Sequence, residues 1–188
     1  KPQAPKPYAR IPFPDSYRIG DTYSMLVYDI KPDEFEYAFS FDGPYEPAKG
    51  LLFNEENVLL DPYSRAVTGQ RKWGEKPEGG KDFEYRARVV KSSFDWGNIK
   101  QLEQPFEDLV IYETHVRGYT KDKSSGVSAP GTFAGLKDKI PYLKDLGINA
   151  VELMPIFEFD EMESARVVDG VQLYNYWGYN TVSFFAPN

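Results

Sequence analysis

The chain of 188 residues has no cysteine and a single histidine, His115. Without cysteine it forms no disulfide bond, and a cytoplasmic location is the default expectation. The sequence also lacks a hydrophobic run long enough to cross a membrane and an N-terminus resembling a signal peptide, so we expect no membrane partner. Because the first residue is Lys1 rather than Met, we also expect that the native start has been removed.

Positive charge is in the minority. The chain has 22 Lys and Arg against 29 Asp and Glu, a net charge of -7, which argues against nucleic acid as a partner. Aromatic residues are abundant, with 14 Tyr, 13 Phe and three Trp. Such rings suit large cores and stacking on the apolar faces of sugars. The composition is therefore typical of a soluble protein with a neutral substrate.

The first half of the chain has the pattern of a small antiparallel β-sandwich. Residues 1–14 carry five prolines and predict an extended lead-in. Strand-like runs follow at 22–30, 35–41 and 83–90, separated by Gly, Pro and Asp turns, and residues 91–108 connect to the second half. A length of 188 residues is long for one domain and short for two complete ones. We expect an incomplete sandwich with an unpaired edge, which is a route to self-association.

The second half begins with the pattern of a strand, a helix and a strand. From Leu109, LVIYETHVRGYT is apolar and rich in β-branched and aromatic residues, as in a buried strand. The following apolar residues recur at steps of three and four and predict one amphipathic helix: Phe133, Leu136, Ile140, Leu143 and Leu146. Thr132 is its expected N-cap and Gly147 its left-handed stop, while Pro141 predicts a kink. The apolar run 148–155 predicts a second strand, parallel to the first.

Three segments carry a resemblance to a known family: VIYETHVRGYT at 110–120, GTFAGLKDKIPYLKDLGINAVELMPI at 131–156 and YNYWGYNTVSFFAPN at 174–188. They resemble the opening of the catalytic TIM (β/α)8 barrel of the α-amylase superfamily, glycoside hydrolase family 13, of the isoamylase and bacterial glycogen debranching type. Residues 37–69 resemble the end of the glycogen-binding-module-like β-sandwich that precedes that barrel. The resemblance implies a mixed fold, with a partial sandwich and linker in 1–108 and a truncated barrel, its first βαβ portion, in 109–188.

The same resemblance implies a substrate-binding role for the loop after the second strand. In this superfamily the tyrosine of a WGY sequence stacks on the glucose ring beside the cleaved bond, which implies that role for Tyr179. For Tyr176 and Trp177, ligand contact and shaping of the pocket both stay open. Asn180 either hydrogen-bonds a hydroxyl or stabilises the turn. For Phe184 and Phe185, simple packing is favoured.

No catalytic residue can be assigned in this chain. Retaining glycosidases need two carboxylates about 5 to 5.5 Å apart, and the resemblance implies that these come from later barrel strands. We therefore expect the isolated chain to be inactive. From the residues alone, Glu113 and Glu152 on consecutive strands are a candidate pair, but structural roles are favoured. His115 as a general base and Arg117 as a substrate clamp are further candidates, and a packed or rim-lining histidine is favoured because no Ser or Cys partner is evident.

For two weaker patterns, a structural interpretation is favoured over a functional one. An acidic group in the loop after the second strand suggests calcium, which some members of the superfamily bind, but its spacing matches no ordered ligand set. We favour a solvated acidic loop and expect no cofactor or metal. These residues are Glu158, Asp160, Glu161, Glu163 and Asp169. Trp73 and Trp96 are candidate glycan contacts, although buried tryptophans are commoner in sandwiches.

Two functional hypotheses follow. In the favoured one, the chain is part of a glycoside hydrolase that cleaves α-1,6 branch points in an α-glucan such as glycogen or starch. In the other, it is a non-catalytic glycan-binding or assembly module. Branching enzymes and pullulanases are the nearest competitors within the hydrolase interpretation, because bond specificity depends on loops outside this chain.

Overall fold

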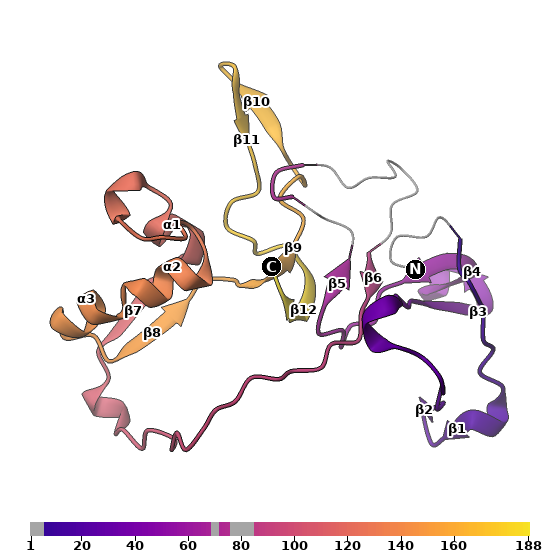
Figure 1. The fold of residues 1–188 in the computed structure, drawn as a ribbon. Coiled ribbons are helices and arrows are strands. Elements are labelled where there is room, and N and C mark those ends of the chain that lie inside the picture. The colour runs from indigo at the N-terminus through magenta and orange to yellow at the C-terminus, as the bar shows by residue number, and fades with distance from the viewer. Residues whose placement is uncertain (1–5, 69–71, 76–84) are drawn as a thin grey trace. The chain divides into compact units, whose positions relative to one another are not determined.

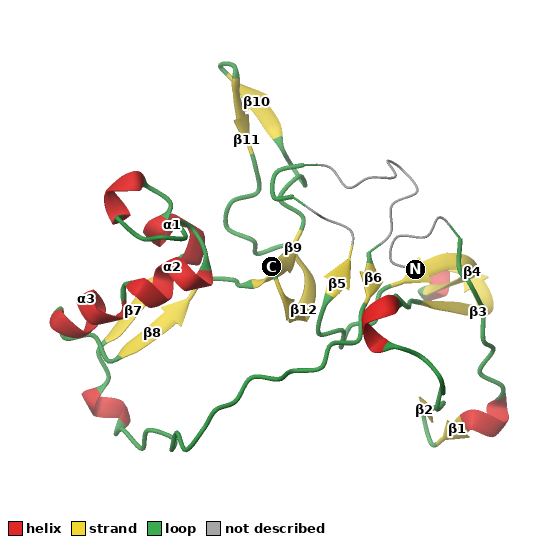
Figure 2. Cartoon of the chain, in the orientation of Figure 1, coloured by secondary structure: helices red, strands yellow, loops and turns green. Residues whose placement is uncertain are grey.

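The computed structural model describes residues 6–68, 72–75 and 85–188 (Figure 1). The fold is mixed, with short helices and small two-stranded sheets (Figure 2). The chain divides into two compact units, one running to Ser92 and including Ser183–Pro187, the other comprising Ser93–Val182 and Asn188.

The first unit is built from antiparallel hairpins. Its longest elements, β3 (Phe39–Glu46) and β4 (Leu51–Leu59), pair with two register shifts and are joined by a 3-10 turn that Gly50 closes at a φ of 77°. The strands are β1 (Arg18–Ile19), β2 (Thr22–Tyr23), β3 (Phe39–Glu46), β4 (Leu51–Leu59), β5 (Val67–Thr68) and β6 (Arg86–Ala87). The 3-10 helices are η1 (Asp15–Tyr17), η2 (Pro32–Glu34) and η3 (Pro47–Lys49).

The strands predicted for this unit were too long at one place and shifted at another. The run 22–30 forms a strand only at Thr22–Tyr23, because a strand requires a partner and residues 24–30 join no ladder within the described parts of the chain. The run 35–41 becomes β3, which begins at Phe39 and continues to Glu46, preceded by a single bridge between Tyr37 and Ala87. Of the run 83–90, residues 83 and 84 lie outside the described residues, and only Arg86–Ala87 is a strand.

The second unit contains the predicted strand, helix and strand. β7 (Ile111–Thr114) and β8 (Ala150–Leu153) are parallel and in register over four residue pairs, which confirms the predicted βαβ arrangement. The other elements of this unit are η5 (Phe106–Asp108), α1 (Val116–Thr120), η6 (Lys123–Ser125), α2 (Phe133–Asp138), α3 (Ile140–Asp145), β9 (Phe157–Phe159), β10 (Arg166–Val168) and β11 (Val171–Leu173). The last strand, β12 (Thr181–Pro187), begins in this unit, and its residues Ser183–Pro187 belong to the first.

The expected single helix is two short helices. α2 begins as predicted, with Thr132 Oγ1 accepting the Gly135 N–H at 3.2 Å, and α3 is followed by Gly147 at a φ of 88°. The break falls at Lys139, two residues before Pro141, since proline donates no backbone hydrogen bond and clashes with the preceding turn. The predicted kink at Pro141 is confirmed, and the prediction of one continuous helix was wrong.

The predicted first strand was also too long. β7 ends at Thr114, and Val116–Thr120 is the short helix α1 rather than extended chain. Gly118 lies inside this helix, and Thr120 at its end is fully buried, with Oγ1 accepting the Gly131 N–H at 2.8 Å. The backbone thus turns sharply at His115, which places that side chain at the carboxyl end of β7.

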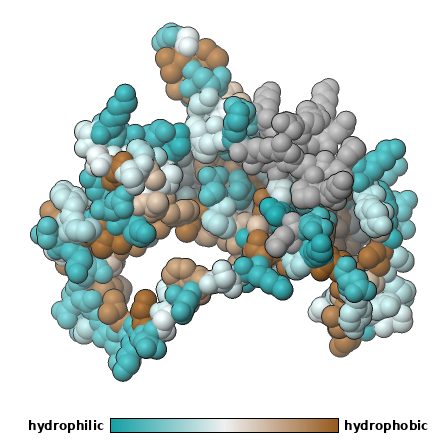
Figure 3. All heavy atoms as spheres, viewed as in Figure 1, coloured by the Kyte–Doolittle hydropathy of each residue, from teal (hydrophilic) through white to brown (hydrophobic). Residues whose placement is uncertain are grey.

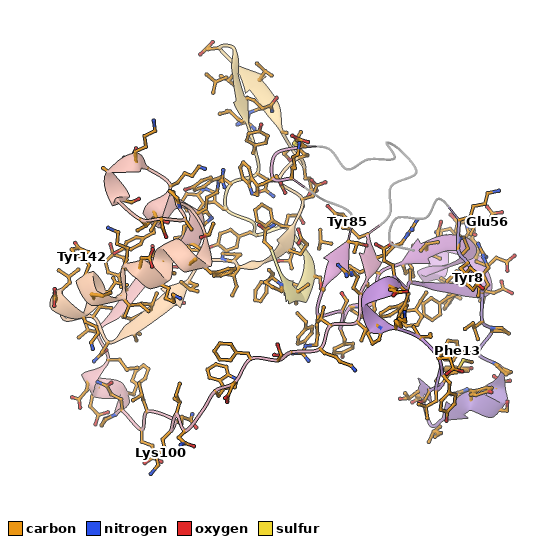
Figure 4. All side chains as sticks on the ribbon, in the orientation of Figure 1. Tyr8, Phe13, Glu56, Tyr85, Lys100 and Tyr142 are labelled. Atoms are coloured by element: carbon orange, nitrogen blue, oxygen red, sulfur yellow. The ribbon has the colours of Figure 1, made fainter. Side chains whose placement is uncertain are left out.

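Exposed apolar side chains are frequent. On α3, Leu143 is 3% exposed and belongs to the core, whereas its neighbour Tyr142, labelled in Figure 4, is 56% exposed. The hairpin of β10 and β11 has the exposed apolar residues Val167 and Val171, and hydrophobic surface is visible near its tip (Figure 3).

Among the described residues, no helix is long and apolar enough to span a bilayer.

Candidate functional site

Three aromatic rings meet where β7 ends. They belong to His115, the residue after β7, and to Tyr176 and Trp177 of the loop that follows β11, which we call the aromatic loop (residues 174–180). The His115 and Tyr176 ring centroids are 4.5 Å apart with the planes tilted by 34°, and Trp177 stands edge-on to His115 at 5.6 Å. Tyr176 and Trp177 are themselves 5.2 Å apart and nearly perpendicular. These separations fall in the range of favourable aromatic pairs.

His115 is also the N-cap of α1. Its Nδ1 accepts the Gly118 N–H at 3.0 Å, so the neutral ring has its proton on Nε2. Burial lowers the pKa of His115, hydrogen bonding with the Tyr176 backbone acts in the opposite direction, and the positive charge of Arg117 lowers the pKa further. The imidazole is therefore neutral at neutral pH. A general base would also be neutral, but Nδ1 is engaged with Gly118 and the ring packs against Tyr176 and Trp177, which fits the packed histidine that the sequence favoured.

The aromatic loop has a turn that requires glycine. The Asn175 N–H donates to the Glu161 carbonyl at 2.9 Å, and Asn175 Oδ1 accepts the Gly178 N–H at 3.4 Å. Gly178 has a φ of 74°, and a Cβ there would lie 2.9 Å from the buried ring of Phe159. Backbone and ring approach so closely here that only glycine fits.

The rings of the aromatic loop differ in exposure. Tyr179 is 69% exposed, Trp177 is 51% exposed and Tyr176 is 38% exposed. The side-chain amide of Asn180 donates to the Glu163 carboxylate, so it stabilises the loop. Tyr179 and Trp177 are thus the rings best placed to meet a ligand from solvent, while Tyr176 is held against His115.

The acidic residues near the loop are not uniformly solvated. Glu161 is only 1% exposed, so the expectation of a solvated loop is wrong at this position. Burial raises the pKa of Glu158 to about 7, with further contributions from the charges of Glu161 and Asp160, while the Asn188 amide favours the ionised form. Within the described ranges, His, Asp and Glu side chains form no group of three or more that could hold a metal ion.

The remaining candidates differ in exposure. Glu113 and Glu152 are register partners on β7 and β8 and so point to the same face of the sheet, and both are exposed. A glycosidase acid/base carboxyl, in contrast, lies in an apolar pocket. Trp96, expected to be buried, is 70% exposed and packs edge-on against Phe94 at 4.9 Å. Trp73 is half-buried.

Phe184 and Phe185, for which packing was favoured, are both more than half exposed. Phe185 nevertheless stacks on Tyr63, with ring centroids 5.5 Å apart. What the sequence pattern did not show was the link between His115 and the aromatic loop, because the two are separated by about sixty residues. Its only sequence signal was a lone histidine directly after a strand.

Comparison with known proteins finds relatives that match nearly the whole of this chain. No family model matches it. It is 40% identical over 180 residues to isoamylase 1, chloroplastic, of Arabidopsis thaliana, covering 93% of this chain and 23% of that protein. It is 36% identical over 192 residues to the glycogen debranching enzyme of Yersinia enterocolitica, covering 94% of this chain and 28% of that protein. The chain therefore spans about a quarter of the length of these relatives.

Solved structures agree with this result. The pullulanase SAP of Group B Streptococcus is 26% identical with a TM-score of 0.52, covering 70% of this chain and 18% of that one. A type I pullulanase of Bacillus subtilis is 25% identical with a TM-score of 0.51, covering 72% of this chain and 19% of that one. The resemblance inferred from the sequence is confirmed: the chain is homologous to one section of the isoamylases and glycogen debranching enzymes.

Proposed function

We propose that the chain is part of an α-glucan debranching glycoside hydrolase, acting on α-1,6 branch points in glycogen or starch, and that its aromatic loop binds the glucan. The observation that carries this proposal is the 40% identity to an isoamylase along nearly the whole chain. The exposed rings of Tyr179 and Trp177 support it, because an aromatic plate can cover the C–H face of a pyranose while leaving its hydroxyls free.

The finer architecture belongs to the same proposal. Residues 109–188 would form the first βαβ portion of a (β/α)8 barrel, and residues 1–108 the end of a β-sandwich. The parallel pairing of β7 with β8 across α2 and α3 supports the barrel assignment. In such barrels the active site lies at the carboxyl ends of the strands, and His115 follows β7 at that end.

The chain's part in the reaction would be binding and orientation. Stacking on Tyr179 holds a glucose unit in place, whereas the nucleophile and the acid/base would come from other strands of the parent protein. The isolated chain should therefore bind α-glucan without cleaving it. A non-catalytic glycan-binding module would behave identically in isolation, so a complete parent protein is needed to separate the two.

The binding test uses the 188-residue chain with maltotetraose, and cellotetraose as a control for the linkage. Saturable binding of maltotetraose that Tyr179→Ala weakens would support the assignment of the loop. No binding, or equal binding of both sugars, would contradict it. Hydrolysis of amylopectin or pullulan by the parent protein then decides between a hydrolase and a binding module. Release of reducing ends by the purified 188-residue chain would contradict the expectation that this chain has no catalytic carboxylates.

Self-association and a cytoplasmic location are further proposals. Self-association is supported by the exposure of large apolar residues in the connecting segment, where Leu102 and Phe106 are at least 80% exposed. Sedimentation velocity across a wide range of concentration tests it. A monomer at every concentration would contradict this proposal.

A further inference from the structure

We propose that His115 is a positioning residue that fastens the aromatic loop to the end of β7 and so determines where the glucan-contacting rings lie. This inference rests on the proposed function for the meaning of those rings, but the fastening itself can be tested without any sugar.

The first support is that one imidazole contacts two segments far apart in the sequence. Nδ1 accepts the Gly118 N–H and so caps α1. The same ring packs against Tyr176 of the aromatic loop, with ring centroids 4.5 Å apart. The imidazole thus links α1 to the aromatic loop, and only the neutral ring, with Nδ1 unprotonated, keeps the cap.

The second support is the packing around the ring. Tyr176 lies over His115 at 4.5 Å and Trp177 meets it edge-on at 5.6 Å. On the α1 side, the Tyr176 hydroxyl lies where a Cβ at position 118 would be, so Gly118 makes room for it. His115 and Gly118 together form the surface on which Tyr176 is seated. Tyr179, three residues later, is carried by the same loop.

A structural cap alone would be the simpler explanation, and the two roles need different atoms. Capping α1 needs an acceptor that Asn also supplies, whereas seating Tyr176 needs the aromatic ring. His115→Asn therefore keeps the cap of α1 and removes the aromatic ring against which Tyr176 packs. His115→Phe keeps an aromatic seat and removes the cap.

The charged group acting on the ring from α1 is Arg117, and the loop side presents the Tyr176 backbone and the neutral rings of Tyr176 and Trp177. Protonation of Nδ1 would abolish its acceptor and place a positive charge near Arg117. The aromatic loop, with Tyr176, should therefore move away from the His115 ring when the imidazole becomes charged. His115 is the single histidine of the chain, so its resonances in an NMR titration are unambiguous.

The experiment follows the indole N–H resonance of Trp177, assigned with Trp177→Phe, in the 188-residue chain. We expect His115→Asn to melt near the unmodified chain, to shift this resonance toward that of an exposed indole, and to raise the Kd for maltotetraose about tenfold. His115→Phe should melt lower and retain more of the resonance shift. An unmoved resonance and an unchanged Kd in a folded His115→Asn chain would overturn the proposal.

The pH titration keeps the proposal testable if both variants unfold. In the unmodified chain the Trp177 resonance should move with the His115 Cε1–H resonance, at a midpoint below 6.5, the ordinary pKa of histidine. The same titration of Glu158→Gln excludes Glu158 as the source. A Trp177 resonance that does not follow the His115 midpoint would overturn the proposal. Failure of the unmodified chain to bind maltotetraose would contradict the proposed function, while the two NMR tests would still decide the role of His115.

Discussion

The βαβ framework (residues 111–153) and the aromatic loop (174–180) are held in place in different ways. The framework repeats one pattern: four consecutive residue pairs join β7 to β8, and Leu143 of α3 is buried in the core. The loop relies on single contacts, each made by one residue, such as the Gly178 backbone over Phe159 or the His115 ring under Tyr176. A distributed framework tolerates many substitutions, whereas such a loop can be displaced by one.

Substituting Gly178 should have the largest effect on the loop. Gly178→Ala places a Cβ in a left-handed backbone conformation and drives it into the buried Phe159 ring at 2.9 Å. The strained conformation and the overpacking together should cost roughly 2 to 4 kcal/mol of stability in this region. Urea unfolding followed by the fluorescence of Trp177, with Trp73 and Trp96 replaced by Phe, measures it.

A matched control separates the two causes. Gly170 has a φ of 78°, but a Cβ there would meet nothing within 4 Å. Gly170→Ala should therefore show only the conformational cost, about 1 kcal/mol. If the two variants lose the same stability, the contact with Phe159 is not what fixes the loop.

The second prediction concerns ligand binding rather than folding. Tyr179 is largely exposed, so Tyr179→Ala should leave the melting temperature nearly unchanged. If the ring covers a glucose unit, the Kd for maltotetraose should rise by roughly tenfold to a hundredfold, or about 1 to 3 kcal/mol, while Tyr179→Phe stays mild. Calorimetry and thermal melts on both variants measure it. A destabilised Ala variant with unchanged affinity would make Tyr179 a structural residue.

The framework was largely predictable from sequence because its signals are local. Thr132, Pro141 and Gly147 act on backbone within a few residues, and each behaves as expected. The errors occurred where a distant partner decides the outcome. The run at 22–30 looks like a strand, but a strand also needs a neighbour, which local sequence does not show.

Only part of the candidate site could be predicted from the sequence. The WGY resemblance implied Tyr179, and the exposure of its ring is compatible with that role. The seat of Tyr176 on His115 and Gly118 depends on three-dimensional closeness between segments about sixty residues apart, and periodicity carries no information about it. The burial of Glu161 was missed likewise, since a cluster of acidic residues ordinarily indicates solvent.

The third prediction tests the seat of Tyr176 by steric rescue. A Cβ in Gly118→Ala would collide with the Tyr176 hydroxyl, so the ring must move away from His115, at a cost of about 1 to 2 kcal/mol. Tyr176→Phe removes the hydroxyl, and the nearest remaining ring atom is then 3.6 Å from the new Cβ, an ordinary contact. The double variant should recover most of the loss, because alanine also favours the helical backbone of α1 over glycine.

A double-mutant cycle from urea unfolding gives the coupling between the two positions. We expect it to be about 1 kcal/mol and favourable in the double variant. Additive effects would mean that the hydroxyl does not lie over Gly118 in solution.

The smallest expected effect is the pH dependence due to Glu158. Its pKa is raised from 4.5 to about 7, chiefly by burial and then by the charge of Glu161. A carboxyl whose pKa is higher in the folded chain contributes stability that is fully present below pH 4.5 and is lost as the pH rises through about 7. His115 acts in the opposite sense, since its lowered pKa removes stability as the pH falls.

Glu158→Gln should therefore be more stable than the unmodified chain at pH values above 7, by about 1 kcal/mol. In this variant the loss of stability toward low pH, due to His115, should remain. Urea unfolding at a series of pH values measures both limbs, with the exposed Glu56→Gln as the control for removing one negative charge. If Glu56→Gln stabilises the chain at high pH as much as Glu158→Gln does, the effect comes from net charge, and the buried position of Glu158 is not its cause.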